Sequence, residues 1–201
     1  MEENNLIIYF VEKDRYREQS LKLSREIVRT CSMYIRQIHK NNINNIDINK
    51  LKNNLTNLNN LVKKNNDLLK YVNTPQQEFV ECVILYNIKY HNNILSYNEL
   101  ENKYKINIIP ENYLLGLCDT IGELRRMILE NIKNDNIYNC KKYYDIMEEL
   151  YDYIMLFDYY NVIDGLRRKQ DVCRSILEKT NSDLVYFMEN IKLRKALVNK
   201  K

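Results

Sequence analysis

The chain has 201 residues, a length that fits one ordinary globular domain. Hydrophobic residues make up 45% and charged residues 29%, a composition that excludes an intrinsically disordered protein. With 3 glycines and 2 prolines the chain cannot make the many turns of an all-β sandwich, and its net charge of +4 permits a nucleic-acid partner without requiring one.

The first half of the chain predicts four helices. Apolar residues recur at heptad-like spacing through the first helix, with no glycine or proline between them. Pro75 suits the first turn of the third helix, and the segment FVECVIL that follows is apolar on nearly every side, so this helix should be buried. Ser96 and Glu99 form the capping-box signature of a fourth, short helix. The first two helices are expected at about Asn5–Lys40 and Ile48–Val72, and the fourth ends near Lys105.

The second half predicts three more helices. Pro110 stands where the first turn of a helix tolerates proline, and that helix should run to about Lys133. The segment NDN then breaks the chain. The last two helices are expected at about Tyr138–Phe157 and Asn161–Val198. Because no linker or repeat divides the sequence, we expect an all-α fold of about seven antiparallel helices in a single domain over residues 1–201.

The cysteines and the N-terminus indicate a cytoplasmic protein. The cysteines are far apart and mostly flanked by apolar residues, which predicts reduced and largely buried thiols at Cys31, Cys82, Cys118, Cys140 and Cys173. No C-x-x-C pair exists and the 2 histidines stand alone, so a zinc site is not expected. Met1 is followed by two glutamates, which is unlike a signal peptide. No apolar run approaches the roughly 18 residues of a membrane span.

Two pairs of acidic residues stand out because each pair lies in an apolar helix. Glu78 and Glu81 are three residues apart, and Asp119 and Glu123 are four apart, so each pair occupies one helix face. Two helices that each present two carboxylates can form an all-oxygen site for Mg²⁺ or Mn²⁺. The alternative is that these acids form structural ion pairs with the arginines that follow Glu123 or with other basic side chains.

Two of the three glycines flank Asp119. Gly116 and Gly122 weaken the helix by about 1 kcal/mol each relative to alanine, but they allow a neighbouring helix or a substrate backbone to approach closely. The sequence contains no glycine-rich phosphate loop, dinucleotide fingerprint or G-x-S-x-G elbow, which disfavours a nucleotide-cofactor enzyme or a serine hydrolase.

Basic residues cluster on the first and last predicted helices. The first helix carries a stripe that includes Arg15, Lys22, Arg25, Arg29 and Arg36. The last helix carries a second cluster of Arg167, Arg168, Lys169 and Arg174. Several Lys and Arg residues on one face can neutralise phosphates and make binding salt-dependent. The alternative is a solvated face that nearby acidic residues balance.

Four segments in combination resemble the translin family, in particular its translin-associated factor X branch. They are LKLSREI (21–27), EFVECV (78–83), PENYLLGLCDTIGELRRM (110–127) and GLRRKQDVCRSILEKTNSDL (165–184). The matches come in the same order as in the family and span most of the chain. The third segment is the most specific, whereas the basic segments alone would be weak signals.

The resemblance implies a seven-helix bundle that assembles into a hollow oligomer around single-stranded RNA or single-stranded DNA. The branch implies a Mg²⁺-dependent endoribonuclease whose catalytic and metal-binding acids are Glu78, Glu81 and Asp119, with Glu123 beside them, and whose last helix binds nucleic acid through Arg167. The chain lacks the basic N-terminal extension and the mid-chain insertion of eukaryotic members. A homo-oligomer of six or eight subunits is therefore expected rather than a complex with a separate translin subunit. The alternative is a non-catalytic binder of single-stranded RNA or DNA.

Overall fold

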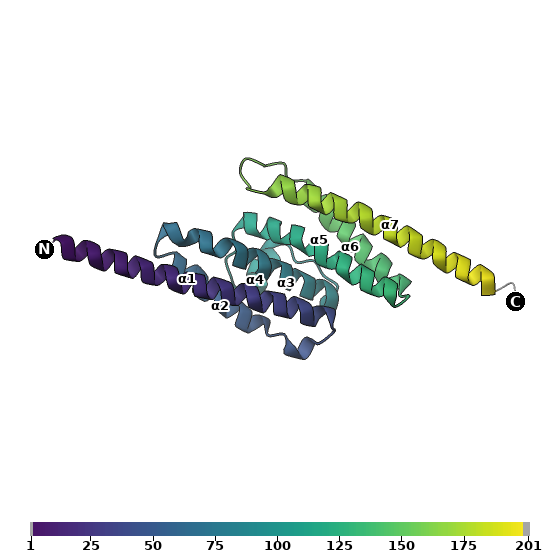
Figure 1. Cartoon of the computed structure of the whole chain (residues 1–201), viewed down its shortest axis with the longest axis horizontal. Helices are drawn as coiled ribbons and strands as arrows, with labels where there is room; N and C mark the ends of the chain where they lie inside the picture. The colour runs from purple at the N-terminus through teal and green to yellow at the C-terminus, as the bar shows by residue number, and fades with distance from the viewer. Residues whose placement is uncertain (1, 199–201) are drawn as a thin grey trace. The chain divides into compact units, whose positions relative to one another are not determined.

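The computed structural model describes residues 2–198, with side chains described from residue 5, and its α-helices are labelled in Figure 1. Seven α-helices are present: α1 (Glu2–His39), α2 (Ile48–Val62), α3 (Asn73–His91), α4 (Tyr97–Tyr104), α5 (Pro110–Lys133), α6 (Ile137–Met155) and α7 (Leu166–Val198). Two 3-10 helices, η1 (Ile43–Asn45) and η2 (Asn66–Val72), precede and follow α2. The described residues form no strand, so the predicted all-α fold with seven helices is confirmed.

The chain divides into two compact units, Met1–Gly116 and Leu117–Lys201. The boundary falls inside α5 and not in a linker, because α5 runs without a break from Pro110 to Lys133. The first turns of α5 therefore belong to the first unit and the remainder to the second. The expectation of a single domain stays a prediction.

In the first unit, α1 packs against both α2 and α3. Ten of the nineteen residues of α3 are buried, which confirms that this helix lies in the core. Phe79 and Ile84 of α3 and Ile27 of α1 are completely buried, and such side chains supply most of the hydrophobic stabilisation. The predicted capping box of α4 is also present: the Ser96 hydroxyl accepts a hydrogen bond from the Glu99 amide, and the Glu99 carboxylate accepts one from the Ser96 amide.

Two predicted helix boundaries are wrong for local reasons. The helix expected over residues 48–72 ends at Val62, and the side chain of Asn65 then accepts a hydrogen bond from the amide of Asp67 to begin η2. The last helix begins at Leu166 and not at residue 161, because Gly165 precedes it with a φ of +76°, a conformation outside the right-handed helix.

In the second unit, α6 packs against α7. The side chain of Gln170, near the start of α7, donates hydrogen bonds to the carbonyl of Ile154 at 3.0 Å and to that of Phe157 at 2.7 Å. Ile154 lies in the last turn of α6, and Phe157 follows the end of that helix at Met155. Gln170 is buried, so it fixes the start of α7 against the end of α6.

All five cysteines are buried free thiols, as predicted. Burial is the main reason why the pKa of the Cys31 thiol lies well above its usual range, and neighbouring Cys82 raises it further. In the second unit, a hydrogen bond with Cys173 and burial together raise the pKa of the Cys118 thiol. Thiols with raised pKa values react slowly, because the thiolate is the reactive form.

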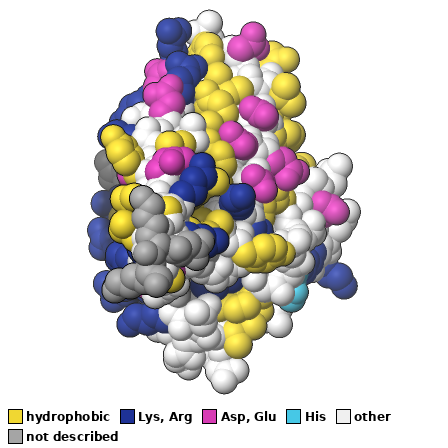
Figure 2. Space-filling view, turned by 90° about the vertical axis from the view of Figure 1, so that its right-hand side faces the viewer, with side chains coloured by type: hydrophobic (Ala, Val, Ile, Leu, Met, Phe, Trp, Pro, Cys, Tyr) yellow, Lys and Arg dark blue, Asp and Glu magenta, His cyan; other side chains and the backbone are white. Residues whose placement is uncertain are grey.

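The surface carries charges of both signs. Figure 2 shows one face, on which acidic and basic side chains occur together with exposed apolar side chains. This mixture agrees with the small net charge of +4. None of the helices that the structure describes has an apolar stretch long enough to cross a membrane.

Candidate functional site

Gly116 brings α5 close to α3 in the first unit. A Cβ atom added to Gly116 would lie 2.7 Å from the Cβ of Val80 and 2.8 Å from the carbonyl oxygen of Gln77, distances that no side chain tolerates without movement. The predicted close approach is therefore confirmed here, and the neighbour is a helix. An added Cβ on Gly122 would meet none of the described atoms within 4 Å, so that glycine leaves open space beside α5.

A buried network of side-chain amides holds α3 against the residues that begin α5. Gln76 donates from Nε2 to Oδ1 of Asn59 at 3.1 Å, and its Oε1 accepts from both Nδ2 of Asn112 and the amide of Ile109, each at 2.9 Å. Asn59 in turn donates to the carbonyl of Asn107 at 2.9 Å. This network was not predicted from the sequence, although its side-chain amides stand at positions that face a core.

Glu78 and Glu81 lie one helical turn apart on α3, and both are partly buried. Their charges contribute, after burial and Cys82, to raising the pKa of the Cys31 thiol on α1. The two carboxylates therefore lie close enough to this buried thiol of α1 to act on it electrostatically. The predicted placement of this pair on one face of a largely buried helix agrees with the structure.

Asp119 and Glu123 lie one turn apart on the part of α5 that belongs to the second unit, and each has a basic neighbour. The Nζ of Lys169 on α7 lies 2.5 Å from Oδ2 of Asp119. Arg126 lies 3.6 Å from Oε2 of Glu123. Asp119 and Glu123 therefore form ion pairs, as the alternative from the sequence proposed. Lys169 lies on another helix, so the spacing of the acids alone did not identify it as a partner.

Arg125 forms its contacts with residues of α7 and so links α5 to α7. Its guanidinium donates to Oγ1 of Thr180 at 2.9 Å and to Oδ2 of Asp183 at 2.8 Å. Thr180 is completely buried, so this contact is shielded from solvent on one side. This contact and the ion pair between Lys169 and Asp119 hold α5 against α7. They therefore fix the position of the α5 face that carries Asp119 and Glu123.

The donor chemistry of the four acids fits a hard divalent cation, because all of them offer carboxylate oxygens. Within either unit, the described residues bring no three His, Cys, Asp or Glu side chains together in a group that could hold a metal. The predicted site draws Glu78 and Glu81 from the first unit and Asp119 and Glu123 from the second. Their union in one metal site stays a prediction.

The basic stripe on α1 is exposed along one side of the helix. A surface hollow of about 460 Å³ is lined by the basic residues Lys22, Arg25 and Arg29, together with Glu18 and Glu26. The guanidinium of Arg15, further toward the N-terminus, lies 5.2 Å from the centre of the Tyr16 ring. The structure therefore brings three basic residues of the predicted stripe to one hollow.

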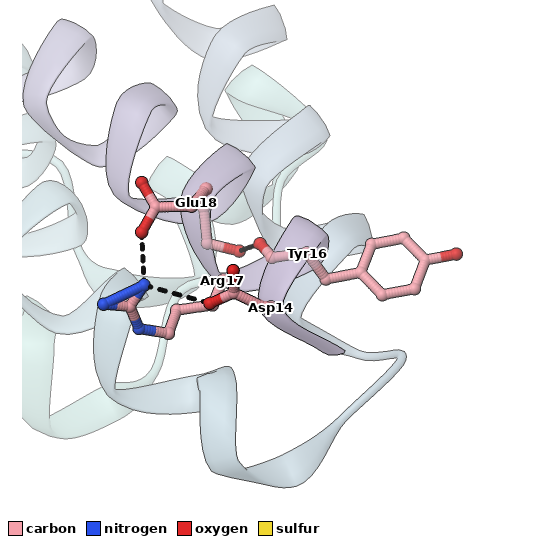
Figure 3. Close-up of polar contacts among 5 residues, drawn as sticks. Asp14, Tyr16, Arg17 and Glu18 are labelled. Carbon is pink, nitrogen blue, oxygen red and sulfur yellow. Dashed lines mark hydrogen bonds and ion pairs between the residues drawn. The ribbon is translucent and has the colours of Figure 1, made fainter. Parts of the chain in front are cut away.

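Acidic side chains neutralise another arginine of the same helix. Arg17 contacts Asp14 at 3.4 Å and also forms an ion pair with Glu18, as Figure 3 shows. The ring of Tyr16 points away from this group (Figure 3). Arg17 is thus paired with acidic neighbours and does not line the hollow.

A second hollow, of about 630 Å³, lies at the start of α7. Arg167, Arg168, Tyr160 and Val172 contribute to its lining, and the guanidinium of Arg167 lies 5.5 Å from the centre of the Tyr160 ring. Arg174 does not line this hollow, and its guanidinium donates a hydrogen bond to the hydroxyl of Tyr151 at 3.2 Å. The arginines were predicted from the sequence, but Tyr160 was not. Its only signal was its place in the tyrosine-containing loop before α7.

Comparison with known proteins identifies relatives along most of the chain. Residues 15–193 match the Translin family. An uncharacterized protein of Methanocaldococcus jannaschii is 50% identical over 200 residues, which cover 96% of this chain and 86% of that protein.

Solved structures with the same fold are also found. The crystal structure of apo-NeC3PO superposes with a TM-score of 0.82 at 22% identity, covering 92% of this chain and 96% of that one. The structure of AfC3PO in complex with duplex RNA gives a TM-score of 0.73 at 23% identity, covering 94% of this chain and 98% of that one. At these identities the likeness concerns the fold.

Proposed function

Because the chain belongs to the translin family, we propose that it is a cytoplasmic RNA-binding protein and a Mg²⁺-dependent endoribonuclease of the translin-associated factor X type. Its substrate is single-stranded RNA, or RNA with single-stranded ends, cut inside a closed homo-oligomer. The observation that carries the proposal is the pair of Asp119 and Glu123 on one face of α5, next to the space that Gly122 leaves open. The structure of AfC3PO, which has the same fold, contains duplex RNA.

Each acidic residue has a role in this proposal. Glu78, Glu81 and Asp119 would hold Mg²⁺, with Glu123 as a further ligand or as a base beside it. The bound cation would lower the pKa of a water molecule and neutralise charge on the phosphodiester. The carboxylates would orient this water through hydrogen bonds, and Glu123 would accept its proton.

The basic hollows would bind the phosphates of the RNA. Arg167 and Arg168 neutralise phosphates, as do Lys22, Arg25 and Arg29 on α1. Arg15 and Arg174, each next to a tyrosine, extend these surfaces. The Tyr160 ring beside Arg167 offers an aromatic face on which an unpaired base can stack. Binding through such contacts is sensitive to salt and tolerant of sequence, and single-stranded DNA would use the same contacts.

A second candidate function is non-catalytic binding of single-stranded RNA or DNA. It is favoured by the ion pairs that Lys169 forms with Asp119 and Arg126 with Glu123, because acids engaged in this way can serve structure alone. The basic hollows would then act without chemistry.

The experiment that separates the two candidates measures cleavage of an end-labelled single-stranded RNA with Mg²⁺ and with EDTA. We expect Glu81→Gln and Asp119→Asn to reduce cleavage by at least about 100-fold, because even outer partners of metal ligands are typically worth 10–100-fold. RNA binding should persist in both variants. Glu149→Gln, a neutralising change at an exposed position of α6, is the matched control and should cleave normally.

The outcomes are distinct for each candidate. Binding without metal-dependent cleavage would support the non-catalytic candidate. Normal cleavage by Glu81→Gln would contradict the assignment of the acids. A wild-type protein that binds no RNA even at low salt would contradict both candidates.

A further inference from the structure

The first turns of α1 expose an uninterrupted apolar segment. Its sequence is LIIYFV, Leu6–Val11, and its six residues have exposed fractions between 52% and 63%. The first buried residue of α1 is Ser20, and Lys13 forms an ion pair with Asp67 of η2. In Figure 1 this end of α1 extends past the other helices of the first unit. The fold of the unit therefore leaves the segment uncovered.

The uncovered area is large enough for a stable interface. Monomeric proteins rarely expose contiguous apolar patches of more than a few hundred Å². Six large apolar side chains at this exposure present on the order of 600 Å², close to the roughly 800 Å² that each partner contributes to a standard interface. The segment is thus comparable in size with one side of a protein–protein contact.

The arrangement of the segment disfavours a lipid partner. Successive residues of a helix are about 100° apart, so six consecutive apolar residues surround the whole helix. A helix that lies on a membrane surface has a polar face opposite its apolar face, and this segment has none. It is also far shorter than the roughly 20 residues of a membrane span. Covering it requires protein surface on more than one side.

The charges next to the segment favour a partner with balanced charge. Residues 12–18 contain three acidic and three basic side chains, with the two signs interspersed. A strongly acidic or strongly basic partner would meet like charges here, whereas a second copy of the chain offers as many opposite charges as this one. A second copy also brings apolar side chains that its own fold leaves uncovered, among them Leu156, Val162 and Tyr186, each more than 70% exposed.

We propose that Leu6–Val11 of α1 is an interface segment that packs against a second copy of this chain. The inference rests on the homo-oligomer in the proposed function and names the residues through which its copies touch. Because every side chain of the segment is more than half exposed, changing it alters assembly and leaves the fold of each copy intact.

The test is the mass in solution by multi-angle light scattering, against a chain mass of 24.4 kDa. The variant Ile7→Glu/Phe10→Glu places two charges in the segment. Gln19→Glu/Ser32→Glu adds the same charges at exposed positions of α1 outside it and is the matched control. We expect wild type and control to share one multiple of the chain mass, and the segment variant to lose at least half of that mass with unchanged helicity by circular dichroism.

Two results would overturn the inference: a segment variant with the wild-type mass, or a wild type that is monomeric at every concentration. Sedimentation with phosphatidylcholine vesicles can give a third contradicting result. In that result, wild type binds the vesicles, the segment variant does not, and the two proteins have the same mass in solution. Cleavage of single-stranded RNA by wild type distinguishes failure of the proposed function. An oligomer that depends on the segment but neither binds nor cuts RNA contradicts only the RNA-binding and ribonuclease function. A monomer that cuts RNA contradicts the interface and the homo-oligomer but leaves the ribonuclease activity in place.

Discussion

Lys169 holds its Nζ 2.5 Å from Oδ2 of Asp119, so a fixed positive charge already lies against one of the acids predicted to bind a metal. The Lys169 and Asp119 side chains are 28% and 39% exposed, and solvent screening limits such a pair to about 1 kcal/mol. A divalent cation that uses Asp119 therefore competes with the lysine for the same oxygen.

Replacing this lysine should strengthen metal binding. We expect Lys169→Gln to raise the affinity for Mn²⁺ or Mg²⁺ by up to about fivefold, since about 1 kcal/mol of competing interaction is removed. Isothermal titration calorimetry without RNA measures this directly. Lys179→Gln, at an exposed position of the same helix, should leave the affinity unchanged. Weaker binding in Lys169→Gln would show that the lysine supports the site and does not compete for it.

The two glycines of α5 should respond to alanine with opposite signs. Gly116→Ala should lower the free energy of unfolding by about 1–3 kcal/mol, because its Cβ would overlap Val80 and the Gln77 carbonyl. Gly122→Ala should raise it by about 0.5–1 kcal/mol, because its Cβ meets open space and alanine favours the helix. Urea unfolding monitored by circular dichroism measures both. Equal effects at the two positions would contradict the close approach of α3 and α5 at Gly116.

Gln76 should be sensitive to an apolar replacement of similar size. Gln76→Leu leaves polar groups of Asn59, Asn112 and Ile109 without their partner in a buried site, so we expect a loss of about 2–3 kcal/mol in the free energy of unfolding. Gln19→Leu on the exposed side of α1 is the control and should change stability by less than about 0.5 kcal/mol. A neutral Gln76→Leu would mean that the network adds no net stability.

The capping box of α4 should make part of the stability depend on pH. Hydrogen bonds from the hydroxyl and the amide of Ser96 lower the pKa of Glu99 below its ordinary value of 4.5. The folded state thus favours the ionised carboxylate, whose contribution is complete above pH 4.5 and is lost as the pH falls through the lower folded pKa. The stability difference between wild type and Glu99→Gln should therefore be larger at neutral pH than at about pH 3 in urea titrations. A difference that is constant with pH would contradict this role.

Local signals in the sequence predicted most of the fold. Pro110 and the capping box at Ser96 mark helix starts that the structure confirms, because such signals act within one turn. The interruption at Asn65 was missed, because leucines continue at helical spacing into η2 while the asparagine side chain captures the backbone. The last helix was also predicted to begin too early, before Gly165, because apolar residues continue at helical spacing there. One of them, Ile163, is buried although it lies in a loop.

The candidate site was less accessible to sequence reasoning. The acids could be paired along a single helix because i,i+3 and i,i+4 spacing fixes which side chains share a face. Lys169 is 50 positions from Asp119, and Gln76 is 36 positions from Asn112. Only the packing of helices brings these residues together, so a pattern within one helix cannot reveal them.

The reactivity of the five buried thiols can be used to measure unfolding of the chain. An alkylating reagent can modify a completely buried cysteine only when the surrounding helices separate. Cys31 and Cys82 lie in the first unit, whereas Cys118, Cys140 and Cys173 lie in the second. Labelling at increasing urea, followed by mass analysis of peptides, would thus reveal the order in which the two units open. Simultaneous labelling of both groups would mean that the helix the units share makes them unfold as one.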